Sequence, residues 1–327
     1  MNVLDENHDC DLKHLFREYI SRTTARCFIS SDLNEEFFTL HKKFSKLVNT
    51  AMIFSYFLPK SLMKITFKPM IRFYRFTLSK FLLRSVKAYR DDPSKSFHCL
   101  IRSAIDFEQA NSGQRLSDSE IANILIAFIW IATENTALGL TNVVIDLIEN
   151  SKYWSLIKEE TSVLTEKNNF EEIINSSLLN ACIMESARLN THLMSLCRLP
   201  ARTNLIIGDE NYLIGVADTI AICAPLMHTF ECSSALFNDA ECYDPLRYFP
   251  PRCENFTSKR VMTWGSGIHL CPGKNFALCE IKLAVAFLSK FIDTIKLTRI
   301  ERKNYFSASA FVDRNAMAEV ILKREMK

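Results

Sequence analysis

Glycine is scarce in this chain of 327 residues, with only 7 in all. Glycine-rich phosphate loops, β-propellers and other folds that turn often on positive φ are therefore disfavoured, and we expect helix to dominate. Three of these glycines, Gly265, Gly267 and Gly273, fall within one short window. That concentration marks the window as a candidate functional loop.

The chain also lacks the spacing of paired cysteines. Its 11 cysteines are an odd number and include no C-x-x-C pair, which argues against a disulfide framework and a structural zinc site. Most lie beside apolar residues, so we interpret them as small buried side chains in a reducing compartment. Cys271, which lies inside the glycine window, is the exception.

Export and membrane signals are missing as well. The N-terminus has neither the basic nor the apolar region of a signal peptide. The longest uncharged runs, 47–59 and 121–133, are shorter than the ~20 residues of a spanning helix, so we expect no transmembrane anchor in this chain. A net charge of +3 is too mild to indicate a nucleic-acid partner.

Apolar material is abundant. A hydrophobic content of 48%, with 24 phenylalanines, is enough for a large buried core. From 12 to 87, apolar residues recur at helical spacing beside a basic polar face. Within this stretch, Pro69–Phe81 could form a membrane-surface or nucleic-acid face, but we expect a solvated helix that packs its aromatic side chains inward.

A long central helix is predicted over 117–149. Ser117 and Glu120 have the spacing of an N-terminal capping box. The apolar run that follows ends in a polar cluster that contains Glu134, Asn135 and Thr136. Burial of Glu134 is costly unless its carboxylate is paired, hydrated or functional.

The rest of the chain gives four further elements. We expect a helix over 170–190, minor hairpin strands over 198–224, a meandering loop without regular structure over 238–256, and a long apolar helix over 272–291.

The glycine window, 264–277, leads directly into the last of these helices. Cys271 stands at the helix start, where free backbone N–H groups and the helix dipole favour a thiolate, and Pro272 suits the first helical position. A thiolate in a loop whose glycines let the backbone lie flat against a planar ligand suits axial ligation of a haem iron. On this window alone, the alternative is a buried cysteine near a helix N-terminus.

The window resembles the haem loop of the cytochrome P-450 superfamily of haem-thiolate monooxygenases. That loop reads F-x-x-G-x-x-x-C-x-G, and this chain has Trp264, Gly267, Cys271 and Gly273 at the same spacing. Only the aromatic residue differs in type. The resemblance implies haem b (iron protoporphyrin IX) as cofactor, with Cys271 as the metal ligand. The implied haem-binding residues are Cys271, Trp264, Gly265, Gly267, His269, Pro272, Gly273 and Ala277.

Two further motifs carry the same resemblance. The family's E-x-x-R helix is similar to Glu185 and Arg188, and the arginine of its meander is similar to Arg247. The resemblance implies that these three side chains form a buried network in a mainly α fold, a helical bundle with a minor β-region. Where many members have an arginine that binds a haem propionate, this chain has His269, which implies a weaker contact.

The family's oxygen-activation helix resembles residues 131–136. Glu134 then takes the acid position and Asn135 the place of the usual threonine, so Glu134, Asn135 and Thr136 are the implied catalytic residues, which relay protons during oxygen activation. The alternative is a hydrated core glutamate with polar neighbours. Asn135 would also suit an isomerase that receives oxygen already reduced within its substrate.

The resemblance implies a single incomplete domain over 1–327. Its parts are mid-fold helices at 1–116, the oxygen-activation helix at 117–149, the E-x-x-R helix at 170–190, the meander at 238–256 and the haem-thiolate loop at 264–277. The family's anchor, N-terminal sheet region and first helices would be missing. Within the superfamily, the chain looks most similar to the branch of cholesterol 7-alpha-hydroxylase and prostacyclin synthase, with sterol 14-demethylase further off.

The implied function is a monooxygenase that inserts one oxygen atom into a sterol-like or fatty-acyl substrate. Electrons would come from NADPH through NADPH-cytochrome reductase or another donor, and a full-length form would lie at the endoplasmic reticulum membrane. The alternatives are a truncated, impaired member that binds haem or a partner, an isomerase that needs no reductase, and an unrelated helical lipid-binding protein.

Overall fold

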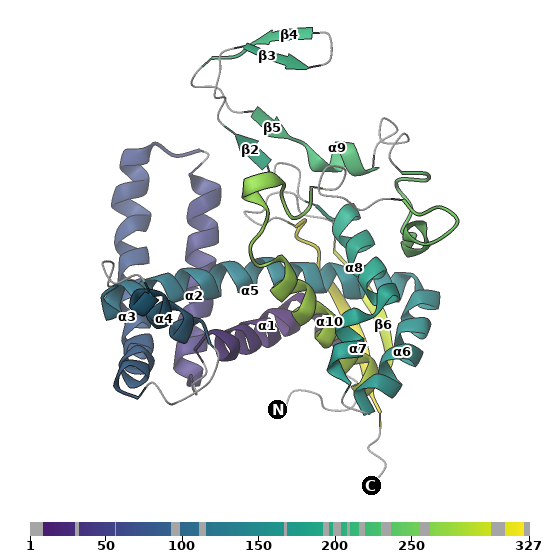
Figure 1. Cartoon of the computed structure of the whole chain (residues 1–327), viewed down its shortest axis with the longest axis horizontal. Coiled ribbons are helices and arrows are strands. Elements are labelled where there is room, and N and C mark those ends of the chain that lie inside the picture. The colour runs from purple at the N-terminus through teal and green to yellow at the C-terminus, as the bar shows by residue number, and fades with distance from the viewer. Residues whose placement is uncertain are drawn as a thin grey trace. The chain divides into compact units, whose positions relative to one another are not determined.

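A computed structural model describes most of the chain (Figure 1). The described residues are 9–29, 33–55, 57–92, 99–110, 116–166, 169–191, 196–198, 204–207, 210–215, 220–229, 237–254, 262–301 and 311–323. Contacts divide the chain into two compact units, which are described separately below: unit 1 comprises 1–10, 139–305 and 309–327, and unit 2 comprises 11–138 and 306–308. Helices are the main elements of both units, which confirms the predicted mainly α fold with a minor β-region.

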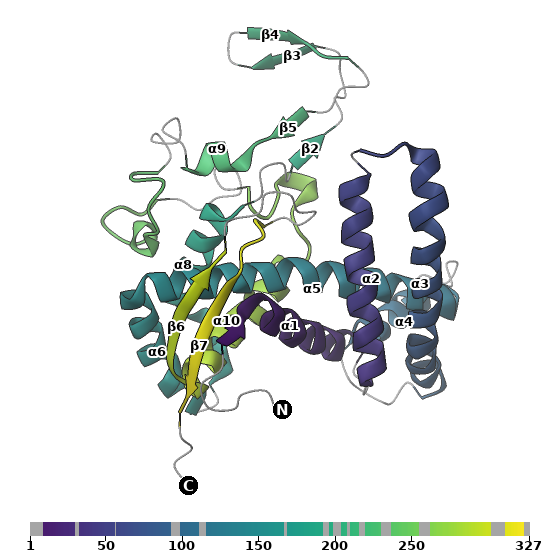
Figure 2. The ribbon, with the colours of Figure 1, turned by 180° about the vertical axis from the view of Figure 1, so that it is seen from behind.

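Unit 2 is built from helices. They are α1 (Leu12–Ile29), α2 (Glu35–Phe54), α3 (Lys60–Asp91), α4 (Leu100–Ala110) and the first part of α5 (Asp118–Glu149). Figures 1 and 2 show α2 and α3 as an antiparallel pair. The core draws buried apolar side chains from every one of these helices, among them Ile29, Phe37, Leu82, Ile105 and Ile126.

Helix α3 departs from the prediction that its aromatic side chains point inward. Tyr74 and Phe81 pack against the core as predicted. Phe73 and Phe76, however, are 64% and 63% exposed, so for these two the prediction is wrong. The aromatic residues of α3 are distributed around the helix, but the core covers only one face of it. The aromatic side chains on the other faces are therefore exposed.

Helix α5 begins with the predicted capping box. The Ser117 hydroxyl accepts a hydrogen bond from the Glu120 N–H at 3.2 Å, and the Glu120 carboxylate accepts one from the Ser117 N–H at 2.8 Å. Among the described residues, α5 is the one helix long and apolar enough to cross a membrane, but 56% of its most apolar window is buried inside the chain. Residues 118–138 belong to unit 2 and residues 139–149 to unit 1.

The described part of unit 1 contains the rest of α5 and five further helices. These are α6 (Ser151–Glu166), α7 (Phe170–Asn175), α8 (Ser177–Leu189), α9 (Ala224–Thr229) and α10 (Lys274–Phe291). The helix predicted over 170–190 is therefore two helices. The break occurs at Ser176, whose hydroxyl accepts from the Leu179 N–H at 3.1 Å and caps α8.

The described strands form three small sheets. The hairpin of β3 (Asn204–Ile207) and β4 (Glu210–Leu213) confirms the hairpin strands predicted over 198–224. β5 (Ile220–Ile222) also lies in that range, whereas its partner β2 (Leu196–Arg198) begins before it. The third sheet, in the order β1-β7-β6, consists of β1 (Asp9–Asp11), β6 (Ile292–Ile300) and β7 (Ala316–Leu322), and was not predicted (Figure 2). In it, β6 and β7 are antiparallel, with Ile295 opposite Val320.

The described residues also include two 3₁₀ turns, η2 (Pro245–Tyr248) and η3 (Gly267–His269). The turn η2 lies in the region 238–256, so the prediction of no regular structure there is wrong for these four residues. Asp244 caps the turn by accepting from the Leu246 N–H at 3.2 Å. Positions 255 and 256 lie outside the described residues.

Candidate functional site

The predicted haem loop closes on itself immediately before α10. The Cys271 N–H donates to the Trp264 carbonyl at 2.7 Å, and the Leu270 N–H donates to the Gly267 carbonyl at 3.1 Å. The Cys271 thiol is free and half-buried. Gly273 is the N-cap of α10 and supplies no side-chain acceptor to the first-turn N–H groups. The first N–H of the helix, that of Lys274, donates to the Cys271 carbonyl at 3.3 Å, so Cys271 lies at the positive end of the helix dipole.

Two of the three glycines have a backbone that glycine alone adopts readily. Gly265 has φ +78° and Gly267 has φ +61°. At position 265 a Cβ would lie 2.5 Å from the His269 carbonyl oxygen, whereas at 267 it would have open space around it. Gly273 has an ordinary φ of −88°, and a Cβ there would lie 3.9 Å from the Cys271 sulfur. The absence of a side chain at 273 leaves room beside the thiol.

The loop presents an apolar surface next to the thiol. Ile268 is 96% exposed and Leu270 is 44% exposed. A haem needs a thiol that can bind its iron, a loop that turns tightly beside it, and apolar side chains that can contact its flat ring. This loop has all three. The residues present therefore fit haem as a ligand.

The other predicted haem-binding residues lie around this loop. Trp264 is half-buried, stacks edge-on against Phe311 with ring centroids 6.0 Å apart, and has an Nε1–H that is buried with no hydrogen-bond partner among the described residues. His269 and Pro272 are exposed, and Ala277 is buried in the first turn of α10.

Glu185, Arg188 and Arg247 form one buried cluster, as predicted. Arg188 binds Glu185 through two nitrogens, with N–O distances of 2.9 Å and 2.8 Å, and the Arg247 Nε lies 2.9 Å from the same carboxylate. All three side chains are fully buried. The Tyr248 hydroxyl also donates to Glu185 at 2.7 Å. Burial first, and then the nearby Glu185 charge, raise the pKa of the Tyr248 hydroxyl well above its ordinary value.

The two arginines tie this cluster to the meander. Arg188 donates to the Ala240 carbonyl at 2.6 Å, and Arg247 donates to the Asn238 carbonyl at 2.7 Å and to Glu254 at 2.8 Å. Carbonyls that would otherwise be buried without a donor are thereby satisfied.

His228 joins the cluster as a neutral ring. The Met262 N–H donates to its Nε2 at 3.3 Å, so Nδ1 carries the proton and bonds to the Arg188 carbonyl at 3.2 Å. Burial lowers the pKa of His228 to about 4. The ring therefore connects α9 and the segment before the haem loop to α8 without adding charge.

A second buried cluster, in the part of α5 that belongs to unit 1, was not predicted. Asp146 accepts from Ser186 at 2.6 Å and from Asn190 at 2.8 Å, and Arg314 forms ion pairs with both Asp146 and Glu149. The available signal was a carboxylate inside an apolar helix, the same signal that singled out Glu134. This cluster ties α5 to α8 and to the segment before β7.

On the oxygen-activation segment, Glu134 is paired. Arg17 of α1 donates to Glu134 Oε2 at 2.9 Å, and Asn49 of α2 donates to the same oxygen at 2.8 Å. Glu134 is only 6% exposed and Thr136 only 4%, whereas Asn135 is half-buried. The sequence predicted that a buried Glu134 needs a partner, but it did not identify Arg17 or Asn49 as that partner. These three catalytic candidates belong to unit 2, and the haem-loop residues belong to unit 1.

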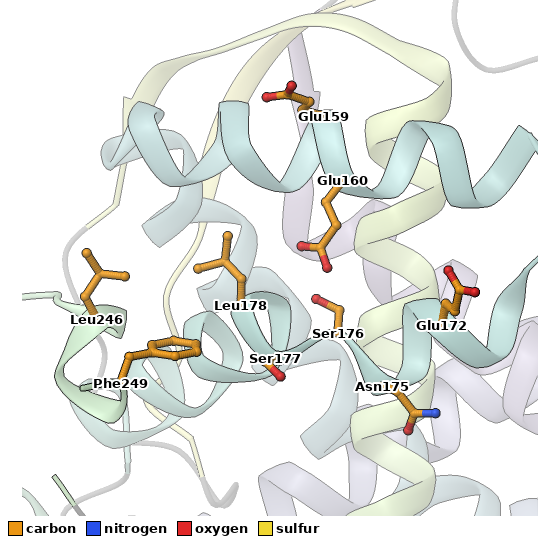
Figure 3. Close-up of a pocket in the computed structure, with 9 residues that line it drawn as sticks. All are labelled: Glu159, Glu160, Glu172, Asn175, Ser176, Ser177, Leu178, Leu246 and Phe249. Carbon is orange, nitrogen blue, oxygen red and sulfur yellow. The ribbon is translucent and has the colours of Figure 1, made fainter. Parts of the chain in front are cut away.

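A pocket of about 790 Å³ lies elsewhere in unit 1 (Figure 3). It is lined by the apolar side chains of Leu178, Leu246 and Phe249 and by carboxylates of α6 and α7. Figure 3 shows Glu160 pointing toward Ser176. None of the residues predicted to bind haem or to relay protons lines this pocket, so it is separate from the predicted haem-binding residues.

Comparison with known proteins agrees with the motifs. The family profile described as Cytochrome P450 matches residues 2–315. The "Probable lanosterol 14-alpha demethylase" of Acanthamoeba polyphaga mimivirus is 38% identical over 306 residues, 93% of this chain and 43% of that protein. The leukotriene-B4 omega-hydroxylase 3 of Mus musculus is 24% identical over 179 residues, 53% of this chain and 33% of that protein.

The fold agrees as well. The crystal structure of the cytochrome P450DA heme domain superposes with a TM-score of 0.76 at 14% identity, covering 98% of this chain and 70% of that one. The aligned part of this chain corresponds to less than half the length of each of the two curated relatives, 43% and 33%. With a family profile that matches nearly its whole length, and with the haem-loop, E-x-x-R and meander motifs in order, the chain belongs to the cytochrome P450 family.

Proposed function

We propose that the protein of which this chain is part is a haem-thiolate monooxygenase that inserts one oxygen atom into a hydrophobic substrate. The single observation that carries this proposal is the position of Cys271. It is a free, half-buried thiol at the end of a loop with two left-handed glycines, directly before the uncapped start of α10.

Cys271 is the residue that would hold the haem iron, and the thiolate-bound haem would supply the oxygen-activating chemistry when bound. The positive end of the α10 dipole lies next to Cys271, which suits a thiolate ligand. Gly265 and Gly267 shape the turn, while Trp264 and the exposed Ile268 and Leu270 give apolar contacts beside the thiol. The Glu185 cluster keeps the meander, and hence the approach to the loop, in place.

In the oxygen-activation segment of α5, Glu134 would hold and deliver protons. Arg17 and Asn49 both donate to its Oε2 and so orient the carboxylate. Oε1 takes part in neither bond, which leaves it the oxygen better suited to carry a proton. Asn135 and Thr136 extend the polar segment along α5. General acid catalysis of this kind contributes roughly 10²–10⁴ in rate.

The relatives' names support a proposal for the substrate class. One relative is described as a probable lanosterol 14-alpha demethylase and another as a leukotriene-B4 omega-hydroxylase, which supports a sterol-like or fatty-acyl substrate. We propose NADPH as the electron source, through NADPH-cytochrome reductase or another donor, and an endoplasmic reticulum membrane location for a full-length form.

The first test is the carbon monoxide difference spectrum of the reduced, haem-supplemented protein, run beside a Cys271→Ser variant. We expect a strongly red-shifted Soret band in the wild type that is lost in the variant. Retention of the band in the variant would refute Cys271 as the ligand. A wild type that binds no haem would instead support an impaired member of the family.

Asn135 favours one second candidate, an isomerase that needs no reductase, because the usual threonine hydroxyl is replaced by an amide. A peroxide-containing lipid would then be converted without NADPH. Turnover of such a substrate in the absence of any electron donor, and no turnover of sterols with one, would favour the isomerase.

A further inference from the structure

A small cavity lies beside Glu134 in unit 2, where α1, α2 and α5 meet. Its lining includes Arg17, His41, Ser45, Thr133 and Glu134. The volume is about 10 Å³, close to the minimum that holds one water molecule.

The cavity gathers polar atoms that lack partners. In the described part of the chain, eight buried side-chain nitrogen and oxygen atoms have no hydrogen-bond partner, and four of them belong to side chains that line this one cavity. They are Arg17 Nε, His41 Nε2, Ser45 Oγ and Thr133 Oγ1. His41, Ser45 and Thr133 are 2%, 4% and 1% exposed. Buried polar atoms that are left unpaired are costly, and a buried water normally bonds about three of them.

The four atoms make a suitable donor and acceptor set for water. The Arg17 Nε–H only donates, the two hydroxyls can donate or accept, and the His41 Nε2 does either according to its tautomer. Burial lowers the pKa of His41 to about 4, so its ring is neutral near pH 7. The other charged groups that face the cavity are Arg17 and Glu18 of α1, Lys42 of α2 and Glu134 of α5.

We propose that this cavity holds an ordered water bonded by His41, Ser45 and Thr133, and that this water returns protons to the Glu134 carboxylate during turnover. The second half of the proposal rests on the proposed function, since it assumes that Glu134 delivers protons. When Glu134 has given up a proton, the water protonates the carboxylate and is itself reprotonated from solvent. His41, Ser45 and Thr133 are positioning residues that act through the water.

Two of the residues that line the cavity are also exposed to solvent. These are Glu18 and Lys42, whose side chains are 36% and 49% exposed, and Glu18 Oε1 lies 3.5 Å from Lys42 Nζ. In this proposal, the proton enters from solvent beside Glu18 and Lys42. Arg17, which also lines the cavity, forms an ion pair with Glu134.

Thermal stability of the full chain tests the water independently of haem. If water bonds the Thr133 hydroxyl, Thr133→Val removes one of its ligands and lowers the Tm by about 2 °C, while Thr133→Ser keeps the Tm near that of the wild type. If the cavity is dry, Thr133→Val removes an unpaired hydroxyl, and an unchanged or raised Tm overturns the proposal. Ser45→Ala should follow Thr133→Val.

Ser79→Ala is the matched control. Ser79 is a buried helical serine of the same unit, but its hydroxyl bonds to the Phe76 carbonyl of its own helix at 2.8 Å. The control measures the loss of an ordinary helix-bonded hydroxyl. A crystal structure of the wild type should show density within hydrogen-bonding distance of Ser45 Oγ and Thr133 Oγ1, and the absence of this density would overturn the water site.

The relay is tested on the haem-loaded protein with its electron donor. We expect His41→Phe and Thr133→Val to divert electrons to hydrogen peroxide and to slow product formation roughly tenfold or more, with Thr133→Ser restoring both. Unchanged electron partition, together with lowered stability, would keep the water site and overturn the relay. A wild type without haem would overturn the proposed function and the relay together, whereas the Tm result would still decide whether the cavity holds water.

Discussion

Glu185 and Arg247 stand 62 positions apart in the chain, yet the Arg247 Nε lies 2.9 Å from a Glu185 oxygen, and neither side chain is exposed. A buried pair of this kind is expensive to form and still more expensive to break, because removing one partner leaves an uncompensated charge in a poorly solvating environment. The pair is therefore the place where the stability of the meander is most sensitive to mutation.

Arg247→Ala should lower the free energy of unfolding by about 3–5 kcal/mol, or prevent folding, because it leaves Glu185 short of one partner and Glu254 of another. Urea denaturation followed by circular dichroism measures this change. Arg252→Ala is the control, since Arg252 also pairs with Glu254 but is 30% exposed. Its loss should cost about 1 kcal/mol or less. Equal effects of the two variants would contradict the assignment of Arg247 to the core of the network.

The two left-handed glycines of the haem loop should differ in their tolerance of alanine. Gly267→Ala should cost about 1–2 kcal/mol, the backbone penalty alone, because a Cβ there meets no atom within 4 Å. Gly265→Ala carries the same penalty and also places a Cβ 2.5 Å from a backbone oxygen, so we expect a larger loss of stability and of haem retention. Thermal unfolding and haem content of both variants check this order, and a Gly265→Ala protein as stable as Gly267→Ala would refute it.

Acid should destabilise unit 1 in part through His228. Its pKa in the folded protein is about 4, below the ordinary 6.5, so between these values the unfolded chain binds a proton that the folded chain does not. The free energy of unfolding should therefore fall as pH decreases from 6.5 to 4, by about 1.4 kcal/mol per pH unit for this histidine. In the His228→Asn variant, the free energy of unfolding should depend less steeply on pH between 4 and 6.5, because the proton taken up at this position is absent. Urea titrations at several pH values measure it, and the same slope in both proteins would rule His228 out as its source.

Ser117→Ala should destabilise the start of α5. The variant loses the hydroxyl that accepts from the Glu120 N–H and the second bond between this hydroxyl and the Glu120 carboxylate. A loss of about 1 kcal/mol is expected, together with faster amide exchange in the first turn of α5. Ser119, next to it, makes a useful comparison: Ser119→Ala leaves both cap residues intact and should change stability much less. Equal losses would contradict the cap.

Sequence patterns predicted the elements that depend on local chemistry. The capping box at Ser117, the hairpin of β3 and β4, and the glycine turn before Cys271 each follow from residues close together in the chain. The Glu185 cluster was predicted through the family resemblance, because no local pattern joins residue 185 to residue 247. Helix α8 was merged with α7 because Ser176 is unremarkable in the sequence and becomes a cap only where the chain turns.

The features that the sequence did not predict depend on contacts between residues that are far apart in the chain. Strand β6 follows α10 without a break and is largely exposed, and its partner β7 is separated from it by a long connecting segment, so its pairing appears only in the folded chain. The outward positions of Phe73 and Phe76 depend on how much of α3 the core covers. The unpaired atoms around the cavity beside Glu134 come from three separate helices, and only a folded chain brings them together.

The half-buried thiol of Cys271, flanked by the exposed Ile268 and Leu270, has a chemical consequence of its own. A sulfur at the start of a helix is a good nucleophile when nothing covers it and inert when a metal holds it. The rate at which an alkylating reagent modifies the peptide that contains Cys271, followed by mass spectrometry, therefore reports directly on occupancy of the loop. Cys182, fully buried in α8, provides an internal reference that stays unmodified for as long as the protein is folded.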